Sequence, residues 1–268
     1  MNRYIQSLAF AACFTHCLSA AALDYYDARV LEKRPQSREH FVQGLEIVDD
    51  ALYVSTGTYG ASALYRYAFP GGELEARRAV DKRIFAEGLT VLDNYVYQLT
   101  WRNRRMLVYE RATLKPLFTL PLPGEGWGLT NNGEALIYSD GSATLRFIAP
   151  VTGKYLRSVN VTLKGEPLRL LNELEWIDGS VWANVWGTET IVVIDPQSGR
   201  VTAQINLGGL LPQEERRPDT DVLNGIARDA STGDIWVTGK RWPWLYRIEL
   251  LPRGENTPDE RISRQISR

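Results

Sequence analysis

Short apolar stretches, separated by Gly, Asp and Asn, run along almost the whole chain. Examples are Leu-Tyr-Val at 52–54, Val-Trp-Ala at 181–183 and Ile-Trp-Val at 235–237. Such stretches are rich in β-branched and aromatic residues and are bounded by turn-forming residues, which is typical of β-strands. No apolar period of a helix extends over a comparable length. The pattern therefore predicts an all-β chain.

The predicted strands fall into five similar groups. Each group begins with an opening such as Phe41-Val-Gln-Gly-Leu-Glu or Phe85-Ala-Glu-Gly-Leu-Thr, and two further strand signals follow it. A unit that recurs about every 40 to 50 residues is the signature of β-propellers and related arrays. The positions interpreted as equivalent in the five openings are Gly44, Gly88, Gly128, Leu174 and Gly225.

A fourth, outer strand is predicted in the first four repeats, at about 73–80, 116–122, 155–161 and 201–207. The fifth repeat lacks one, but residues 27–34 precede Phe41 much as residues 77–83 precede Phe85. The sequence therefore predicts a five-bladed β-propeller whose last blade is closed by an N-terminal strand, which limits exposed strand edges. The alternative is a β-sandwich, but that fold gives no reason for internal repetition.

The first residues resemble a secretory signal. Arg3 precedes an apolar stretch at 7–18, and Ala20-Ala21-Ala22 offers a cleavage site. A membrane anchor is the alternative, but the stretch is shorter than the roughly 18 to 20 apolar residues that span a bilayer. We therefore expect a signal peptide at 1–22, one propeller domain at 23–252 and a polar C-terminal tail at 253–268. The expected location is periplasmic or secreted, with no membrane association after signal removal.

Composition excludes several kinds of chemistry. Both cysteines, Cys13 and Cys17, lie inside the predicted signal, and His40 is the only histidine beyond it. This inventory excludes a catalytic cysteine, a histidine-based triad and a multi-histidine zinc site in the mature chain. The 31 basic and 32 acidic residues are spread along the sequence, so a nucleic-acid partner is not expected. A monomer is the default expectation.

The residue before each Gly-Leu pair is predicted to line the central channel. These residues differ between the repeats and are Gln43, Glu87, Trp127, Glu173 and Asn224. Side chains that differ between otherwise similar repeats can give a symmetric scaffold one site. The alternative is that the polar ones only bind water and satisfy the backbone.

Tryptophans and one lysine strengthen the prediction of a site. Trp101 and Trp186 lie fourteen residues after Glu87 and Asn172, respectively. An aromatic pocket around a carboxylate raises its pKa by desolvation, toward values useful for general acid–base catalysis. Lys240 occupies the loop position in the fifth repeat that Trp101 has in the second. If it points inward rather than to solvent, it can stabilise an oxyanion.

The motifs resemble those of the plant and bacterial glutaminyl-peptide cyclotransferases, from about Phe41 to Leu250. The matching motifs include Phe-x-Glu-Gly-Leu-Thr at 85–90, Gly-Glu-Gly-Trp-Gly-Leu-Thr at 124–130, Leu-Asn-Glu-Leu-Glu at 171–175 and Thr-Gly-Lys-x-Trp-Pro at 238–243. The resemblance implies an acyltransferase that converts the N-terminal glutamine of a peptide or protein to pyroglutamate and releases ammonia. The resemblance implies that catalysis requires no cofactor. A structural calcium ion in the channel stays possible.

The resemblance also implies roles for single residues. Glu87 is the implied acid–base residue, with Asn172 and Lys240 as its polar partners. The residues implied to bind substrate are Phe41, Gln43, Phe85, Trp101, Trp127 and Trp186.

Two other functions stay open at this point. One is a calcium-dependent lactonase-like propeller, in which oxygens of Glu46, Glu87, Asn172 and Asn224 hold the cation. The other is a non-catalytic binding propeller, since a fold does not fix a function.

Overall fold

The computed structural model describes residues 23–253, so the predicted signal peptide and nearly all of the predicted tail lie outside the described residues. Within this part of the chain the regular elements are strands, apart from one short 3-10 helix at Gln213–Glu215. The prediction of an all-β chain is therefore confirmed. Between residues 23 and 253, no helix is long and apolar enough to cross a membrane.

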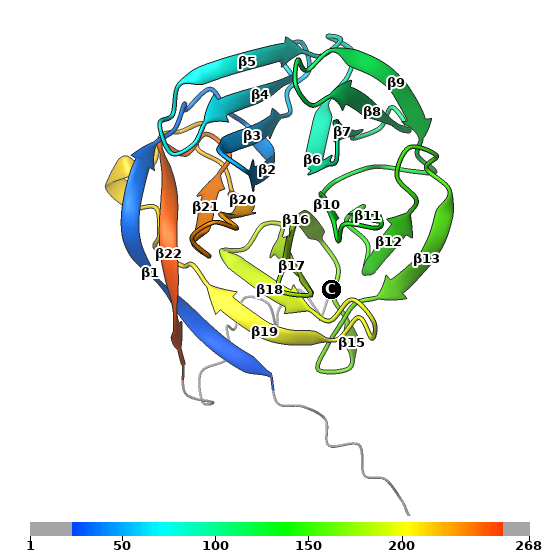
Figure 1. Cartoon of the computed structure of the whole chain (residues 1–268). Helices are drawn as coiled ribbons and strands as arrows, with labels where there is room; N and C mark the ends of the chain where they lie inside the picture. Colours follow the sequence, from blue (N-terminus) through cyan, green and yellow to red (C-terminus); the bar gives the residue numbers. More distant parts are fainter. Residues whose placement is uncertain (1–22, 254–268) are drawn as a thin grey trace, which may run out of the picture.

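Three antiparallel four-stranded sheets, which we call units 1, 2 and 3, follow one another along the chain (Figure 1). Unit 1 contains β2 (Val42–Val48), β3 (Ala51–Thr56), β4 (Ala63–Ala68) and β5 (Leu74–Ala79). Unit 2 contains β6 (Ala86–Leu92), β7 (Tyr95–Thr100), β8 (Arg105–Glu110) and β9 (Pro116–Pro121). Unit 3 contains β10 (Leu129–Asn131), β11 (Leu136–Tyr138), β12 (Thr144–Ile148) and β13 (Tyr155–Asn160).

The remaining long strands form one eight-stranded sheet in the order β16-β17-β18-β19-β1-β22-β21-β20. Its first half, unit 4, contains β16 (Leu171–Ile177), β17 (Ser180–Val185), β18 (Thr190–Ile194) and β19 (Val201–Asn206). Its second half, unit 5, contains β20 (Leu223–Arg228), β21 (Ile235–Gly239), β22 (Trp244–Pro252) and the N-terminal β1 (Asp24–Pro35). A small hairpin of β14 (Thr162–Leu163) and β15 (Glu166–Pro167) follows unit 3.

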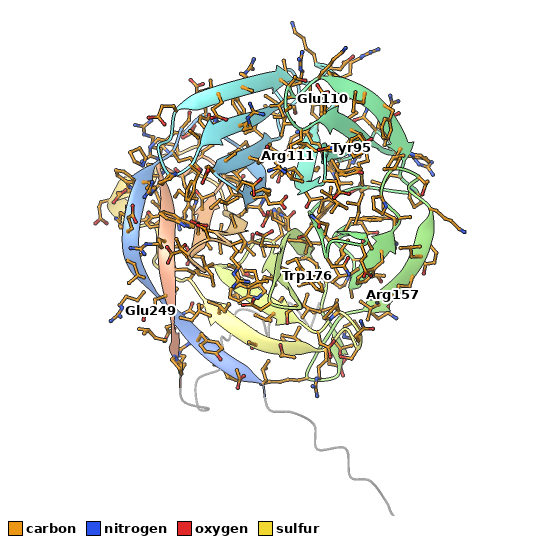
Figure 2. All side chains as sticks on the ribbon, in the orientation of Figure 1. Tyr95, Glu110, Arg111, Arg157, Trp176 and Glu249 are labelled. Atoms are coloured by element: carbon orange, nitrogen blue, oxygen red, sulfur yellow. The ribbon has the colours of Figure 1, made fainter. Side chains whose placement is uncertain are left out.

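Strand β1 connects the two ends of the described chain. It runs antiparallel to β22 from Tyr26 opposite Pro252 to Pro35 opposite Trp244, and its first residues pair in parallel with β19. Figure 2 places Glu249 on the outer rim, where its carboxylate pairs with Arg29 of β1.

The first strands of the units form a closed ring around the centre. Strands β2, β6, β10, β16 and β20 each contact the next, and β20 contacts β2. A Cβ atom on Gly88 would lie 2.5 Å from the backbone nitrogen of Leu129, so glycine permits this close approach. The outermost strands are more exposed, and apolar side chains such as Leu99 and Tyr138 pack between neighbouring units.

The strand register corrects the alignment of the fourth repeat. Leu89 pairs with Gln98 in unit 2, and Leu174 takes the same place opposite Ala183 in unit 4. Leu174 is therefore equivalent to Leu89, and the prediction that it matches the glycines is wrong by one residue. Glu173 holds the glycine position and Asn172 holds the position of Glu87. The sequence concealed this shift because the fourth repeat has no glycine to mark it.

Candidate functional site

Every residue for which the family resemblance implied a catalytic or substrate-binding role lies around one cavity of about 450 Å³ at one end of the central ring. The cavity is lined by Phe41, Gln43, Phe85, Glu87, Trp101, Trp127, Asn172, Trp186, Lys240 and, in addition, Asp221. Residues of the first strands and the loops beside them thus converge from all five units.

Glu87 is held in place by a buried chain of hydrogen bonds. Its side chain emerges near the start of β6, and its backbone carbonyl accepts a hydrogen bond from the Ser55 hydroxyl. The Gln98 side chain donates to Ser55 Oγ at 2.8 Å, and the Tyr109 hydroxyl donates to Gln98 Oε1 at 2.9 Å. All of these residues are buried. Because these hydrogen bonds connect Ser55 of unit 1 with residues of unit 2, they fix the backbone of Glu87 against the neighbouring sheet.

The environment of Glu87 disfavours its ionised form. Burial raises the pKa of its carboxyl well above the ordinary value of 4.5. The positive charge of Lys240 acts in the opposite direction and lowers this pKa, while the negative charge of Glu125 raises it. A carboxylate in such a setting is a stronger base than one in water, and at neutral pH it can both accept and return a proton.

Lys240 points inward, which answers the question that the sequence left open. It follows β21, only 4% of its surface is exposed, and its Nζ lies 5.0 Å from the centre of the Phe41 ring. Burial lowers the pKa of Lys240, whereas the charges of Glu87 and Asp221 raise it. The backbone N–H of Asp221 donates to the carbonyl oxygen of Lys240, and the backbone N–H of Lys240 donates to that of Val222. Asp221 therefore lies beside the lysine.

Asn172 is supported in the same way as Glu87, in the equivalent position of unit 4. The Ser139 hydroxyl donates to the backbone carbonyl of Asn172 at 2.7 Å, as Ser55 does to Glu87. Asn172 itself is buried, and its side chain faces the cavity together with Gln43. These supporting serines were not singled out from the sequence, although each occupies the end of a second strand in its repeat.

Aromatic rings form the wall of the cavity. Phe41 and Phe85 meet edge to face at 6.3 Å, Phe85 and Trp101 at 5.6 Å, and Trp127 and Trp186 at 6.3 Å between ring centres. Trp186 is 44% exposed and lies at the rim. The wall therefore offers apolar surface with one polar corner, an arrangement typical of pockets for small ligands.

The sequence analysis missed three residues at or beside this wall. Tyr59 is half exposed, and its ring lies 5.4 Å from that of Phe85. Glu125 accepts hydrogen bonds from the indole N–H groups of Trp101 and Trp127. Asp221 lies between the 3-10 helix and β20 and lines the cavity. For Glu125 a signal existed, because it stands within the motif at 124–130.

Glu173, predicted to face the channel, does not line the cavity. It is fully buried, and its two carboxyl oxygens accept hydrogen bonds from Leu45 N at 3.2 Å and from Ile226 N at 2.9 Å. Burial and the neighbouring Glu175 and Glu46 raise its pKa well above 4.5. Glu173 thus links the first strand of unit 4 to those of units 1 and 5.

Of the four residues proposed to hold calcium in a lactonase-like propeller, Glu87 and Asn172 line the cavity, whereas Glu46 and Asn224 do not. Glu46 Oε2 accepts a hydrogen bond from Val91 N at 2.7 Å. Across residues 23–253, no group of three or more His, Cys, Asp or Glu side chains is placed to hold a metal ion.

Comparison with known proteins gives consistent matches. A sequence model of the glutamine cyclotransferase family matches residues 4–250. The glutaminyl-peptide cyclotransferase of Arabidopsis thaliana is 37% identical over 231 residues, which cover 84% of this chain and 71% of the relative. The crystal structure of Myxococcus xanthus glutaminyl cyclase matches with a TM-score of 0.80 and 30% identity, over 87% of this chain and all of the other. The WD40 repeats of RRP9, at 12% identity and a TM-score of 0.52, cover 84% of this chain and 98% of the repeats, and show similarity of fold alone.

Proposed function

This chain belongs to the glutamine cyclotransferase family, and we propose that its channel-end cavity carries out the reaction of a glutaminyl-peptide cyclotransferase through Glu87. The enzyme is an acyltransferase that acts on a peptide or protein with an N-terminal glutamine. The observation that carries the proposed mechanism is a buried carboxylate beside a buried lysine, inside a wall of aromatic rings.

The substrate supplies its own nucleophile. Its α-amine attacks the carbon of its side-chain carboxamide, the new carbon–nitrogen bond closes a five-membered ring, and the bond to the amide nitrogen breaks to release ammonia. The cavity has to hold the glutamine folded on itself, and fixing such a geometry lowers the barrier because little entropy remains to be lost. The aromatic wall fits this task, since it encloses the apolar part of the side chain.

The polar residues divide the proton transfers and the charge between them. Glu87 in its ionised form takes a proton from the attacking amine and later gives it to the departing ammonia. Lys240 and Asn172 stabilise the oxyanion that forms on the carboxamide oxygen. Gln43 of β2, whose Oε1 lies 3.5 Å from Nδ2 of Asn224 in β20, is assigned to substrate binding.

The fold that carries this site is proposed to be a five-bladed β-propeller whose last blade is completed by β1. Three separate four-stranded sheets, the eight-stranded sheet that divides at β1, and the closed ring of first strands support this description. The cavity depends on a closed ring of units, because residues of every unit line it.

Export, assembly and cofactor use are also proposals. The Arg3-led apolar segment and Ala20-Ala21-Ala22 support a signal peptide, and hence a periplasmic or secreted enzyme. We propose that the mature enzyme acts as a monomer and that its catalysis needs no metal. If so, EDTA leaves ammonia release unchanged. Loss of activity on chelation that calcium restores would instead favour the metal-dependent alternative.

The direct test is incubation of the mature protein with a peptide that begins with glutamine. We expect the mass of the peptide to fall by one ammonia. Glu87→Gln should lower kcat by about 10²- to 10⁴-fold, since it removes the proton acceptor and keeps the side-chain shape. Glu166→Gln, at an exposed glutamate of β15, is the matched control and should turn over normally. Near-normal ammonia release by Glu87→Gln in a folded protein would refute the role of Glu87.

A further inference from the structure

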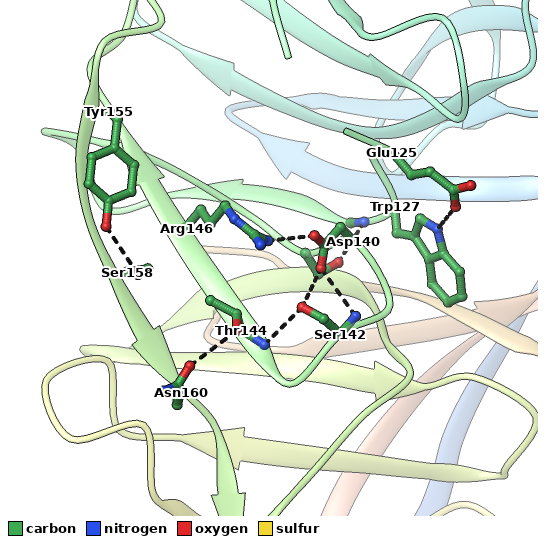
Figure 3. A network of polar contacts seen from close by, with 11 residues as sticks. Glu125, Trp127, Asp140, Ser142, Thr144, Arg146, Tyr155, Ser158 and Asn160 are labelled. Atoms are coloured by element: carbon green, nitrogen blue, oxygen red, sulfur yellow. Dashed lines mark hydrogen bonds and ion pairs between the residues drawn. The ribbon is translucent and has the colours of Figure 1, made fainter. Parts of the chain in front are cut away.

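One carboxylate joins two tryptophans of the cavity wall. Trp101 Nε1 donates to Glu125 Oε2 at 2.8 Å, and Trp127 Nε1 donates to the same oxygen at 3.1 Å. Figure 3 shows the bond from Trp127 to Glu125, at the edge of unit 3. Trp101 belongs to unit 2 and Trp127 to the start of unit 3, so a single side chain sets the distance between two units' contributions to the wall.

A cation completes this arrangement from the solvent side. Arg102 Nε donates to the other oxygen, Glu125 Oε1, at 3.1 Å, and its guanidinium lies 3.9 Å from the centre of the Trp101 ring. The Arg102 side chain is 62% exposed and that of Glu125 39% exposed. Three hydrogen bonds keep the pKa of the Glu125 carboxyl below its ordinary value despite partial burial, so it is ionised at neutral pH.

The negative charge of Glu125 also acts on the proposed acid–base residue. Among the described residues, the charges that act on Glu87 are Lys240, which favours its ionised form, and Glu125, which disfavours it. Two further charges act indirectly. Asp221 raises the pKa of Lys240, and Arg102 lowers the pKa of Glu125. The ionisation of Glu87 therefore depends on a balance between the positive charge of Lys240 and the negative charge of Glu125.

We propose that Glu125 is a positioning residue of the enzyme, which holds Trp101 and Trp127 against the substrate and places a negative charge beside the cavity that contains Glu87. Glu125 acts through other residues and need not touch the reacting atoms. The proposal rests on the cyclotransferase activity assigned above to the same cavity.

The kinetic test uses two substitutions of Glu125. Glu125→Ala removes both acceptors, and since hydrogen bonds to charged groups are strong we expect KM for a Gln-initiated peptide to rise about tenfold, with a smaller change in kcat. Glu125→Gln keeps one acceptor oxygen but loses the charge. It should shift the acid limb of the kcat/KM profile to lower pH, because Glu87 then ionises more easily. Glu134→Gln, at an exposed glutamate elsewhere in unit 3, should change neither quantity.

Arg102→Gln provides a control of opposite sign. It leaves both indole bonds to Glu125 in place but removes the cation that offsets the carboxylate. The acid limb should therefore move to higher pH, against the direction expected for Glu125→Gln. A role limited to stability predicts no such opposite shifts, and acid limbs that stay unchanged in both variants would overturn the proposal.

A measurement without turnover separates this proposal from the proposed function. In ¹⁵N-labelled protein, the indole N–H signals of Trp101 and Trp127 should both move and exchange faster with solvent in Glu125→Gln, while those of the remote Trp236 and Trp244 stay in place. If the wild type released no ammonia but the two indole signals responded, the assigned reaction would fail and the link between the tryptophans would stand. Indole signals that do not respond to Glu125→Gln would overturn the link itself.

Discussion

Glu87 and Lys240 illustrate at the scale of single residues how burial creates reactivity. Each side chain alone is pushed by desolvation toward its neutral form, and each is drawn back toward its charged form by the other. The net result is that the pKa of the Glu87 carboxyl is raised and the pKa of the Lys240 ammonium is lowered. Both changes bring the pKa values of the two groups closer to neutral pH.

Replacing Lys240 by methionine tests this coupling. The neutral side chain removes the charge that lowers the pKa of Glu87, so that pKa rises further and the acid limb of kcat/KM moves to higher pH. Loss of a group that we propose to stabilise the oxyanion should also lower kcat by about 10²- to 10³-fold. Both quantities follow from ammonia release measured across pH. Lys115→Met, at an exposed lysine, should behave as wild type, and an acid limb unmoved by Lys240→Met would contradict the coupling.

At the scale of elements, the first strands show how one position serves different ends. Four units keep glycine at this position, and at Gly44, Gly88 and Gly128 the backbone of the next first strand approaches closely. Unit 4 has Glu173 instead, and its carboxyl bonds the backbone N–H groups of Leu45 and Ile226. A side chain thereby replaces close packing as the link between first strands.

Truncation of Glu173 should therefore weaken the whole protein without touching the cavity. Glu173→Ala leaves two buried N–H groups unpaired, and at about 1–3 kcal/mol for each we expect the free energy of unfolding to fall by roughly 3 kcal/mol. Glu173→Gln retains one acceptor and should fall between the wild type and the alanine variant in urea unfolding. Glu166→Ala, on exposed β15, is the control. Equal stability of Glu173→Ala and wild type would show that the link is not needed.

At the scale of the whole molecule, the centre of the ring concentrates acidic side chains. Glu46, Glu173 and Glu175 are buried there, and burial raises the pKa of each carboxyl. The charge of a neighbouring glutamate raises the pKa of Glu173 and of Glu175 further. For Glu46 the pKa rises from 4.5 to about 8. Proton uptake by these groups is thus linked to folding.

Stability should fall as the pH rises from 6.5 to 8. The folded protein keeps a proton on Glu46 that the unfolded chain has lost above pH 4.5, so the unfolding free energy decreases until the pH passes about 8. His40, whose pKa burial lowers from 6.5 to about 4, acts in the opposite direction only below pH 6.5.

Urea unfolding at both ends of this pH window measures the effect. The contribution of Glu46 is roughly 2 kcal/mol over this range, and Glu46→Gln should flatten the decline by that amount. A wild-type protein that gains stability between pH 6.5 and 8 would contradict this account.

Much of this enzyme follows from its sequence alone. Apolar stretches bounded by turn residues specify strands locally, so the outer strands β5, β9, β13 and β19 were predicted to within a residue. The repeated openings predicted that Glu87 faces the channel. The family motifs implied the other residues of the site, and these residues line the same cavity.

Only the tertiary structure decided how side chains from different units meet. That Glu125 joins Trp101 to Trp127, that Lys240 is buried, and that Glu173 rather than Leu174 replaces a glycine depend on contacts between residues far apart along the chain. A local sequence pattern indicates which face of a strand is buried. It does not indicate which residue a buried side chain contacts, because the packing of whole sheets around the ring determines that contact.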